Sequence, residues 1–185
     1  TISGEFAVHS ELLAVGKQAN AKLPGSVVDL DHGYQLGDHS LWSKHTNFEL
    51  ATRVPLFVSL PRTASKGKAT NSLVELVDLF PTLADLCGLP YPSHLEGKSF
   101  GSVIFDPSVE TRSEAYSEFT RNGALGRSIR TDQFRYIEWR DQKTEEIVSR
   151  ELYDYAMDPG ENVSIAGNPE NAKTVASLSK QLSLR

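Results

Sequence analysis

Residues 31–44, with the sequence DHGYQLGDHSLWSK, hold the side chains of this chain that are best suited to chemistry. Asp31 and His32 are adjacent, and Gly33 lets the backbone turn sharply enough to aim both side chains at one point. Such a pair suits a divalent cation or a proton transfer, whereas Lys44, a compact cation with three donors, suits a sulfate or phosphate oxyanion. The spacing alone also allows a turn-capping Asp31, a His32 that donates to a carbonyl and an ordinary surface Lys44.

The other histidines and the cysteine are weaker candidates. Asp38 and His39 have the character of turn and surface residues, and so do His45 and His94. Cys87 is the only cysteine, so it can form neither an intrachain disulfide nor a thiolate metal cage. Its apolar surroundings in the sequence predict a small core residue.

The elements that position the 31–44 segment are predicted from the flanking sequence. SVVDL, residues 26–30, indicates a short strand that delivers Asp31 at its carboxyl end, where open α/β sheets place ligand-binding groups. RVPLFVSLP, residues 53–61, has the apolar run of a strand buried on both faces. Residues 4–22 place apolar side chains on one helical face and predict a helix. This part of the chain is therefore expected to be α/β.

A further helix is predicted at residues 78–88. Asp78 can cap its start, Pro81 falls in the first turn, where a missing N–H is harmless, and Gly88 stops it. Leucines at helical spacing give it an apolar face, so we expect it to pack on a sheet. These leucines are Leu79, Leu83 and Leu86.

From about residue 110 the chain consists of short aromatic or β-branched segments separated by turn residues, which predicts an antiparallel sheet. The last segment is predicted as a helix with Asn168 as its cap and Pro169 first. Its inward side chains are expected to be Val175, Leu178 and Leu182. We therefore divide the chain into an α/β part, residues 1–109, and a small C-terminal antiparallel sheet with a packed helix, residues 110–185.

Charge and hydropathy argue against two classes of partner. With 185 residues and a formal charge of -5, the chain lacks the basic excess of a nucleic-acid binder. Its apolar runs are far shorter than the roughly 20 residues that cross a bilayer, and it shows no signal peptide. The arginines and aromatics of residues 127–140 could line an anionic pocket, although such alternation is typical of any half-exposed sheet.

Several blocks, taken in order, resemble the C-terminal portion of a type I sulfatase, in particular the iduronate-2-sulfatases and their bacterial relatives. The blocks are DHGYQLGDHSLWSKHTNFELATRVPL, SLVELVDLFPTLADLCGL, EGKSF, SIRTDQFRYIEW and ELYDYAMDPGENVSIA. The resemblance covers about residues 27–185, and residues 1–26 match the family poorly. It implies part of an alkaline-phosphatase-like fold and a periplasmic, secreted or lysosomal protein.

The resemblance also assigns roles to single residues. It implies that Asp31 and His32 help to hold a calcium ion and that Lys44 contacts the sulfate group. A hard cation prefers the carboxylate oxygen of Asp31. His32 is a softer ligand, so it can instead lie near the sulfate or the nucleophile.

Two features depart from the family pattern. The family's nucleophile is a formylglycine made within a C-x-P-S-R type motif, which these 185 residues do not contain, and Cys87 is followed by GLPY. We therefore expect no catalytic nucleophile in this chain, an incomplete calcium site, and no turnover without an N-terminal sulfatase half. Asp29 within the first strand is costly to bury, which predicts a strand at an edge or one built differently from the family's.

The sequence thus predicts a sulfuric ester hydrolase of sulfated sugars whose catalysis needs upstream sequence. The first residue, Thr1, is a hint that such sequence exists. The alternatives are a phosphodiesterase or phosphonate hydrolase of the same superfamily, and a non-catalytic remnant that binds sulfated glycans. Asn162 begins an acceptor pattern for N-glycosylation, a pattern that is frequent by chance.

Overall fold

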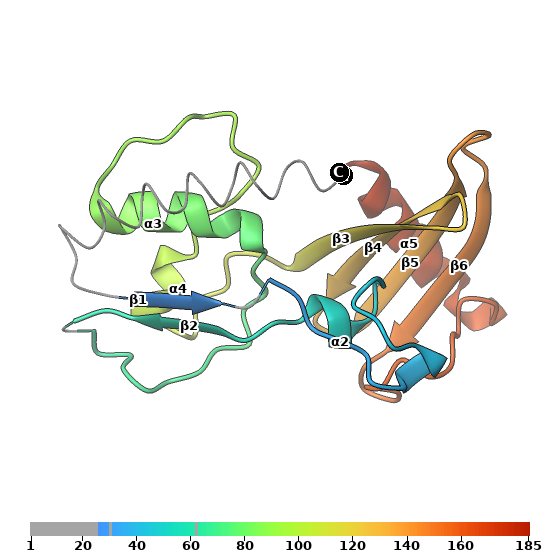
Figure 1. The fold of residues 1–185 in the computed structure, drawn as a ribbon, viewed down its shortest axis with the longest axis horizontal. Helices are drawn as coiled ribbons and strands as arrows, with labels where there is room; N and C mark the ends of the chain where they lie inside the picture. Colours follow the sequence, from blue (N-terminus) through green and yellow to red (C-terminus); the bar gives the residue numbers. More distant parts are fainter. Residues whose placement is uncertain (1–25, 30, 62) are drawn as a thin grey trace. The chain divides into compact units, whose positions relative to one another are not determined.

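The structure, a computed structural model, describes residues 26–29, 31–61 and 63–185 (Figure 1). The helix expected at residues 4–22 lies outside this part. The strands and helices are β1 (Ser26–Asp29), α2 (Glu49–Thr52), β2 (Leu56–Ser59), α3 (Leu79–Cys87), α4 (Gly101–Phe105), β3 (Glu114–Arg121), β4 (Ala124–Thr131), β5 (Phe134–Asp141), β6 (Ile147–Asp154) and α5 (Ala172–Ser183). Short 3-10 helices are η1 (Asp38–Ser40), η2 (Leu76–Asp78) and η3 (Pro169–Asn171). No helix in the described ranges is long and apolar enough to span a bilayer.

The described residues form two compact units. Residues 26–29, 55–61 and 63–113 make up the N-terminal unit, and residues 31–54 and 114–185 make up the C-terminal unit. The segment that was singled out for chemistry therefore belongs with the C-terminal sheet. The domain boundary near residue 110 stays a proposal.

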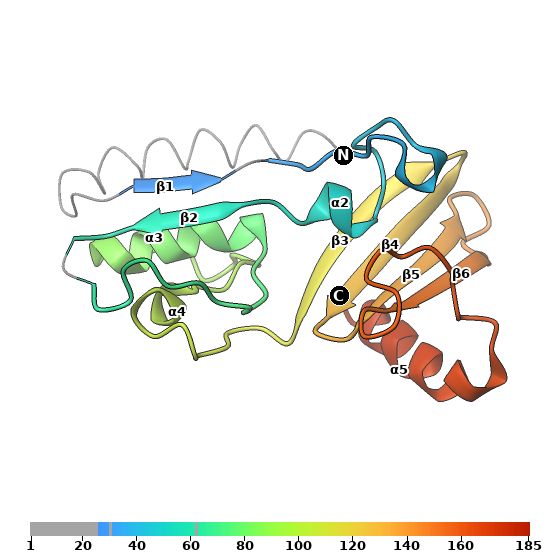
Figure 2. The same ribbon diagram turned by 90° about the horizontal axis from the view of Figure 1, so that it is seen from below.

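In the N-terminal unit, β1 and β2 pair antiparallel, with Ser26 opposite Ser59 and Asp29 opposite Leu56. Figure 2 shows α3 and α4 on one side of this pair. Their shared core contains Leu79, Phe100 and Val103, and partly buried strand residues pack against it. The predicted helix on a sheet is confirmed.

Two expectations for this unit are wrong in detail. β2 alternates between half-buried and exposed residues, and Phe57 is 67% exposed, so the strand is not buried on both faces. Asp78 directly precedes α3, but its side chain does not cap that helix; it accepts hydrogen bonds from the backbone N–H groups of Glu75 (2.9 Å) and Lys98 (2.7 Å). It also pairs with buried Arg112, whose Nε lies 2.7 Å from Asp78 Oδ2. Asp78 thus joins three segments of the unit.

The other predictions for this unit hold. Pro81 lies in the first turn of α3, and Gly88 ends the helix with φ of 62°, a value that glycine adopts without strain. Cys87 is a buried free cysteine, as its sequence context predicted. Asp29 is exposed on β1, which avoids the cost of burying its carboxylate.

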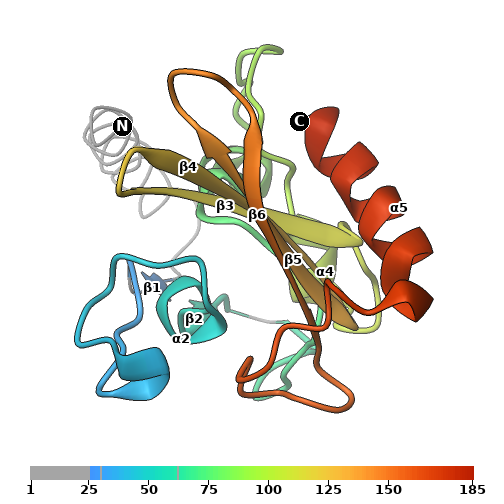
Figure 3. The same ribbon diagram turned by 90° about the vertical axis from the view of Figure 1, so that its right-hand side faces the viewer.

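The C-terminal unit is an antiparallel sheet in the order β3-β4-β5-β6 with α5 packed on one face (Figure 3). Asn122 and Gly123 form the tight turn between β3 and β4, and both have the positive φ that such hairpins require. The core on the α5 face comprises Ile129, Tyr136, Leu152, Leu178 and Leu182, with Val175 partly buried beside it. The predicted sheet and packed helix are confirmed.

Neighbouring residues of a strand point to opposite faces of a sheet. Ile129 and Tyr136 face α5, so Ser128 and Arg135, next to them in the sequence, face the other side. That second face carries residues 31–54 and α2 (Figure 3). The sheet therefore serves as the scaffold of the candidate functional segment.

Candidate functional site

The DHG loop, residues 31–47, starts with a close approach between two backbones. The Gly33 N–H donates to the carbonyl oxygen of Ala51 at 2.9 Å. A Cβ on Gly33 would lie 1.9 Å from the carbonyl oxygen of Leu50. Only glycine fits here, and the contact fixes the start of the loop on α2.

Asp31 and His32 stand together next to this contact. His32 Nδ1 lies 2.7 Å from the carbonyl oxygen of Gly33, and because a carbonyl only accepts, Nδ1 carries the proton. His32 Nε2 lies 3.9 Å from Asp31 Oδ1, and the Asp31 side chain is 85% exposed. A carboxylate and an oriented ring nitrogen are thus presented side by side.

Lys44 lies on the returning arm of the same loop. The two arms pair through Gln35 N–H to Ser43 O (3.0 Å) and Gly37 N–H to Leu41 O (2.9 Å). Lys44 follows Ser43 directly and is exposed, and within the described residues it makes no ion pair. The structure therefore brings Asp31 and His32 together and places Lys44 on the opposite arm without contact to either.

The end of the loop is fixed on the sheet by Asn47, which is 2% exposed. Its Nδ2 donates to the carbonyl oxygen of Gly126 on β4 at 2.9 Å, and its Oδ1 accepts from the Ser117 hydroxyl on β3 at 3.2 Å. The ring of His45 stacks on Phe119 with centroids 5.8 Å apart. His45 is thus a packing residue of the loop.

A buried charge network fixes α2 on the same face. Arg135 on β5 donates to Glu161 Oε1 and to Glu49 Oε2, both at 2.6 Å. Glu161 Oε2 in turn accepts the backbone N–H of Glu49 at 2.7 Å, and the Tyr155 hydroxyl donates to Glu161. Arg135 and Glu161 are each 2% exposed, so these charges are balanced within the protein.

The electrostatics of this network favour its ionised form. Burial opposes ionisation of Glu49, but the charges of Arg135 and Arg130 outweigh it and hold the pKa of the carboxyl below its ordinary value of 4.5. Burial and the nearby carboxylate of Glu161 raise the pKa of Tyr155, although Arg135 opposes this shift. Tyr155 is therefore a neutral hydrogen-bond donor at physiological pH.

Sequence reasoning missed this network. The sequence allows the arginines of residues 127–140 to line an anionic pocket, yet Arg135 forms ion pairs with two carboxylates of its own unit, Glu49 and Glu161. The available signal was an arginine flanked by Phe134 and Tyr136 in a strand that is rich in aromatic residues. Its partners, 26 and 86 residues away in sequence, left no local pattern.

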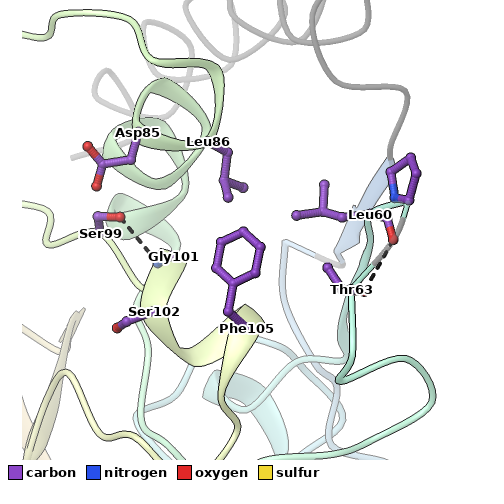
Figure 4. A pocket seen from close by; sticks show the side chains of 9 residues that line it. Leu60, Thr63, Asp85, Leu86, Ser99, Gly101, Ser102 and Phe105 are labelled. Atoms are coloured by element: carbon purple, nitrogen blue, oxygen red, sulfur yellow. Dashed lines mark hydrogen bonds between the residues drawn. The ribbon is translucent and has the colours of Figure 1, made fainter.

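A separate cavity of about 450 Å³ lies in the N-terminal unit (Figure 4). Leu60, Leu86 and Phe105 give it an apolar lining, and Asp85 is its one carboxylate among the described residues. No side chain of the DHG loop lines it. This cavity is therefore not the candidate site.

Comparison with known proteins identifies the family. The sequence model of the family N-sulphoglucosamine sulphohydrolase, C-terminal, matches residues 37–185, which is more than half of the chain. The chain belongs to this sulfatase family. The match includes Lys44 and all four strands of the C-terminal sheet.

Individual sulfatases show the same relationship. The chain is 34% identical over 138 residues to a sulfatase of Formosa agariphila, with 75% of this chain and 25% of that protein covered. It is 32% identical over 196 residues to human iduronate 2-sulfatase, with 70% of this chain and 36% of that protein covered. A Delta 4,5-hexuronate-2-O-sulfatase of Bacteroides thetaiotaomicron is 29% identical over 158 residues, with 81% and 32% covered. The chain thus spans about a quarter to a third of these relatives.

Solved structures confirm the fold. A protein in complex with its substrate D-glucosamine-2-N,6-O-disulfate matches with a TM-score of 0.76 and 28% identity, covering 86% of this chain and 33% of that one. A phosphonate monoester hydrolase of Silicibacter pomeroyi matches with a TM-score of 0.72 and 27% identity, covering 85% and 33%. The chain therefore has part of the alkaline-phosphatase-like fold of the sulfatases.

Sulfatases in general use a divalent metal ion, and the DHG loop offers part of a shell for one. The Nδ1–H bond of His32 to a backbone carbonyl is the arrangement that orients metal-binding histidines. Its Nε2 and Asp31 Oδ1 are close enough to contact one cation. Within the described residues, however, no three His, Cys, Asp or Glu side chains gather where they could hold a metal. The pair fits as two ligands of a larger set.

Proposed function

We propose that this sulfatase-family chain supplies the C-terminal part of the active site of a hydrolase that cleaves sulfate esters of sulfated sugars. Two of the relatives are an iduronate 2-sulfatase and a hexuronate 2-O-sulfatase, which favours a sulfated uronic acid as the substrate. Because the chain spans about a third of these proteins, hydrolysis is proposed for a protein that also contains the remaining part of the fold.

The observation that carries this proposal is the oriented Asp31–His32 pair in a loop of a sulfatase-family chain. We assign both residues to metal binding, with calcium as the cation because the carboxylate is a hard oxygen ligand. When bound, such an ion supplies positive charge next to the sulfate group. His32 is supported as a ligand by its orienting bond to the Gly33 carbonyl, and Asp31 by its carboxylate oxygen 3.9 Å from His32 Nε2.

Lys44 is assigned to the sulfate group of the substrate. Cleavage of a sulfate ester redistributes negative charge over the sulfuryl oxygens, and a fixed ammonium group stabilises that charge. The exposed Lys44 ammonium is available for such an anion. Its place on the paired arms of the DHG loop limits the positions that it can reach.

The nucleophile is proposed to come from outside these residues. The C-x-P-S-R motif is absent from the 185-residue sequence, and Cys87 is buried within α3. We therefore expect the chain by itself to bind a sulfated ligand weakly and to show no turnover of an aryl sulfate.

An NMR titration of the 185-residue chain tests the proposal. Inorganic sulfate and a sulfated uronic-acid disaccharide, each with and without calcium, should shift the amide signals of the DHG loop. Lys44→Ala should abolish the shifts, whereas Lys66→Ala, which removes the same charge from an exposed site of the N-terminal unit, should leave them unchanged. Equal effects of the two variants, or no shifts in the loop, would contradict the proposal.

The phosphonate monoester hydrolase neighbour supports a second candidate function. A tetrahedral phosphonate offers anionic oxygens to the same lysine and cation. Phenylphosphonate and phenyl sulfate, titrated in competition, distinguish the two candidates. Preference for phosphonate by more than about tenfold would favour the second. Calcium-independent binding of the sulfated disaccharide would instead favour a non-catalytic glycan-binding role.

A further inference from the structure

The tip of the DHG loop has a backbone conformation that needs external support. Gly37 has φ of 118°, and the non-glycine residues His39 and Ser40 follow with φ of 51° and 58°. Left-handed conformations of non-glycine residues are unfavourable and persist where surrounding contacts enforce them. The contacts that enforce this one are therefore candidates for a functional role.

His39 makes these contacts with its whole side chain. Its ring stacks on Phe48 with centroids 3.9 Å apart and planes 10° apart. Its Nε2 lies 3.1 Å from the carbonyl oxygen of Gly160 and 3.0 Å from that of Glu161, so this nitrogen carries a proton and donates. Its Nδ1 lies 3.0 Å from Oε1 of the fully buried Gln35 amide, whose Nε2 has no partner among the described residues, so the amide in its flipped orientation donates to Nδ1.

Glu161, whose backbone carbonyl oxygen accepts a hydrogen bond from His39 Nε2, is itself held in place by other contacts. Its carboxylate accepts hydrogen bonds from Arg135 and from the backbone N–H of Glu49. The turn that contains Glu161 is held by Asp158, whose carboxylate accepts hydrogen bonds from the backbone N–H groups of Asn162 (2.6 Å) and Val163 (2.8 Å). The His39 ring thus joins the loop tip to the buried charge network.

We propose that His39 is a positioning residue of the sulfate-ester site. By holding the tip between the two arms of the DHG loop, it fixes the place of Lys44 on one arm relative to Asp31 on the other. This inference rests on the proposed function, because it gives His39 a role in presenting Lys44 to the anion. His39 acts through the loop and touches no substrate.

Three variants separate the side-chain contacts from the backbone strain. His39→Ala removes the ring but keeps the strained conformation, and His39→Gly removes the ring and relieves the strain. His39→Gln removes the ring but keeps an N–H donor that can reach a backbone carbonyl. If the ring contacts position the loop, Ala and Gly are both defective and Gln recovers part of the loss.

Two measurements on the 185-residue chain test the inference. Amide hydrogen exchange of Gln35 and Gly37 should accelerate about tenfold in His39→Ala, the worth of one ordinary hydrogen bond. Exchange in the centre of β4 and β5 should stay unchanged. Sulfate affinity, followed by the NMR titration, should fall by a similar factor, whereas the faster loop exchange should persist in a Lys44→Ala background, since none of the contacts that His39 makes within the described residues involves Lys44.

The outcomes are distinct. Faster loop exchange with weaker sulfate binding and partial recovery in His39→Gln supports the positioning role. Unchanged loop exchange overturns it, and so does unchanged sulfate affinity in a His39→Ala variant whose loop is loosened. Failure of the wild-type chain to bind sulfate contradicts the proposed function and the positioning role together, whereas normal wild-type binding with an unaffected His39→Ala contradicts the positioning role alone.

Discussion

Gly33→Ala should distort the DHG loop through a direct backbone collision. The new Cβ would lie 1.9 Å from the carbonyl oxygen of Leu50, whereas ordinary contact begins at 3.4 Å. The two segments must therefore separate by about 1.5 Å, because a backbone carbonyl cannot turn aside as a side chain can. Such a shift breaks the 2.9 Å bond from Gly33 N–H to Ala51 O.

The expected loss of stability combines two effects. The broken hydrogen bond costs about 1 kcal/mol, and overpacking costs about 1–3 kcal/mol. The free energy of unfolding of the C-terminal unit should thus fall by roughly 2–4 kcal/mol. Because Asp31 and His32 directly precede the collision, calcium and sulfate titrations should also lose their shifts in the loop.

Urea unfolding measures this loss, and Gly167→Ala is the matched control. Gly167 lies in the same unit, and a Cβ there would meet nothing within 4 Å. Its replacement should change stability by less than about 0.5 kcal/mol. A Gly33→Ala variant that unfolds at the wild-type urea concentration and retains its ligand-induced shifts would refute the reasoning.

Three further predictions concern buried charges. Arg135→Met leaves the Glu161 carboxylate buried without its cation and should destabilise the C-terminal unit by about 3–5 kcal/mol in urea unfolding; a loss below about 1 kcal/mol would contradict this. Arg112→Met should have a comparable effect on the N-terminal unit, because Asp78 is only 1% exposed, and hydrogen exchange resolved by residue should confine the change to that unit. The pKa of the Glu49 carboxyl is lowered in the folded protein, so its contribution to stability is present above pH 4.5 and is lost as the pH falls through the lowered value. Glu49→Gln should therefore flatten the acid side of the curve of stability against pH. Parallel curves for the wild type and the variant would exclude this account.

The C-terminal sheet and α5 were predictable because their information is local. Short segments rich in aromatic and β-branched residues favour strands, and turn residues such as Asn122 and Gly123 mark the hairpins. The spacing of Leu178 and Leu182 predicts α5 in the same way, but its predicted start is too early: Pro169 begins η3, and α5 begins at Ala172. These elements can be predicted from a single sequence because the residues that define each strand or helix lie within that element or next to it.

The predictions for β2 and Asp78 are wrong because a short sequence pattern is compatible with more than one structure. The apolar run around β2 is compatible with burial on one face or on two, and the exposed Phe57 shows the first. Asp78 precedes a helix as a cap would, yet Arg112, 34 residues later, takes its carboxylate. Tertiary contacts of this kind override local propensity, and no local pattern records them.

The candidate site shows the same division between local and distant information. The types and order of Asp31, His32 and Lys44 predicted an anion and cation site, and the resemblance to sulfatases supplied their roles. The contacts that hold this segment reach residues far along the chain. Asn47 bonds to β3 and β4, and Glu49 and His39 bond to Glu161.

A loop with exposed charged side chains pays conformational entropy whenever a ligand orders it. In this chain much of that ordering takes place during folding, because Gly33 fixes the DHG loop on α2, Asn47 fixes it on the sheet and His39 fixes it on the segment around Glu161. The strained φ of His39 is tolerable for the same reason, because the C-terminal unit supplies the opposing contacts. Substitutions in the turn around Glu161, far from Lys44 in sequence, should therefore weaken sulfate binding while the lysine itself is intact.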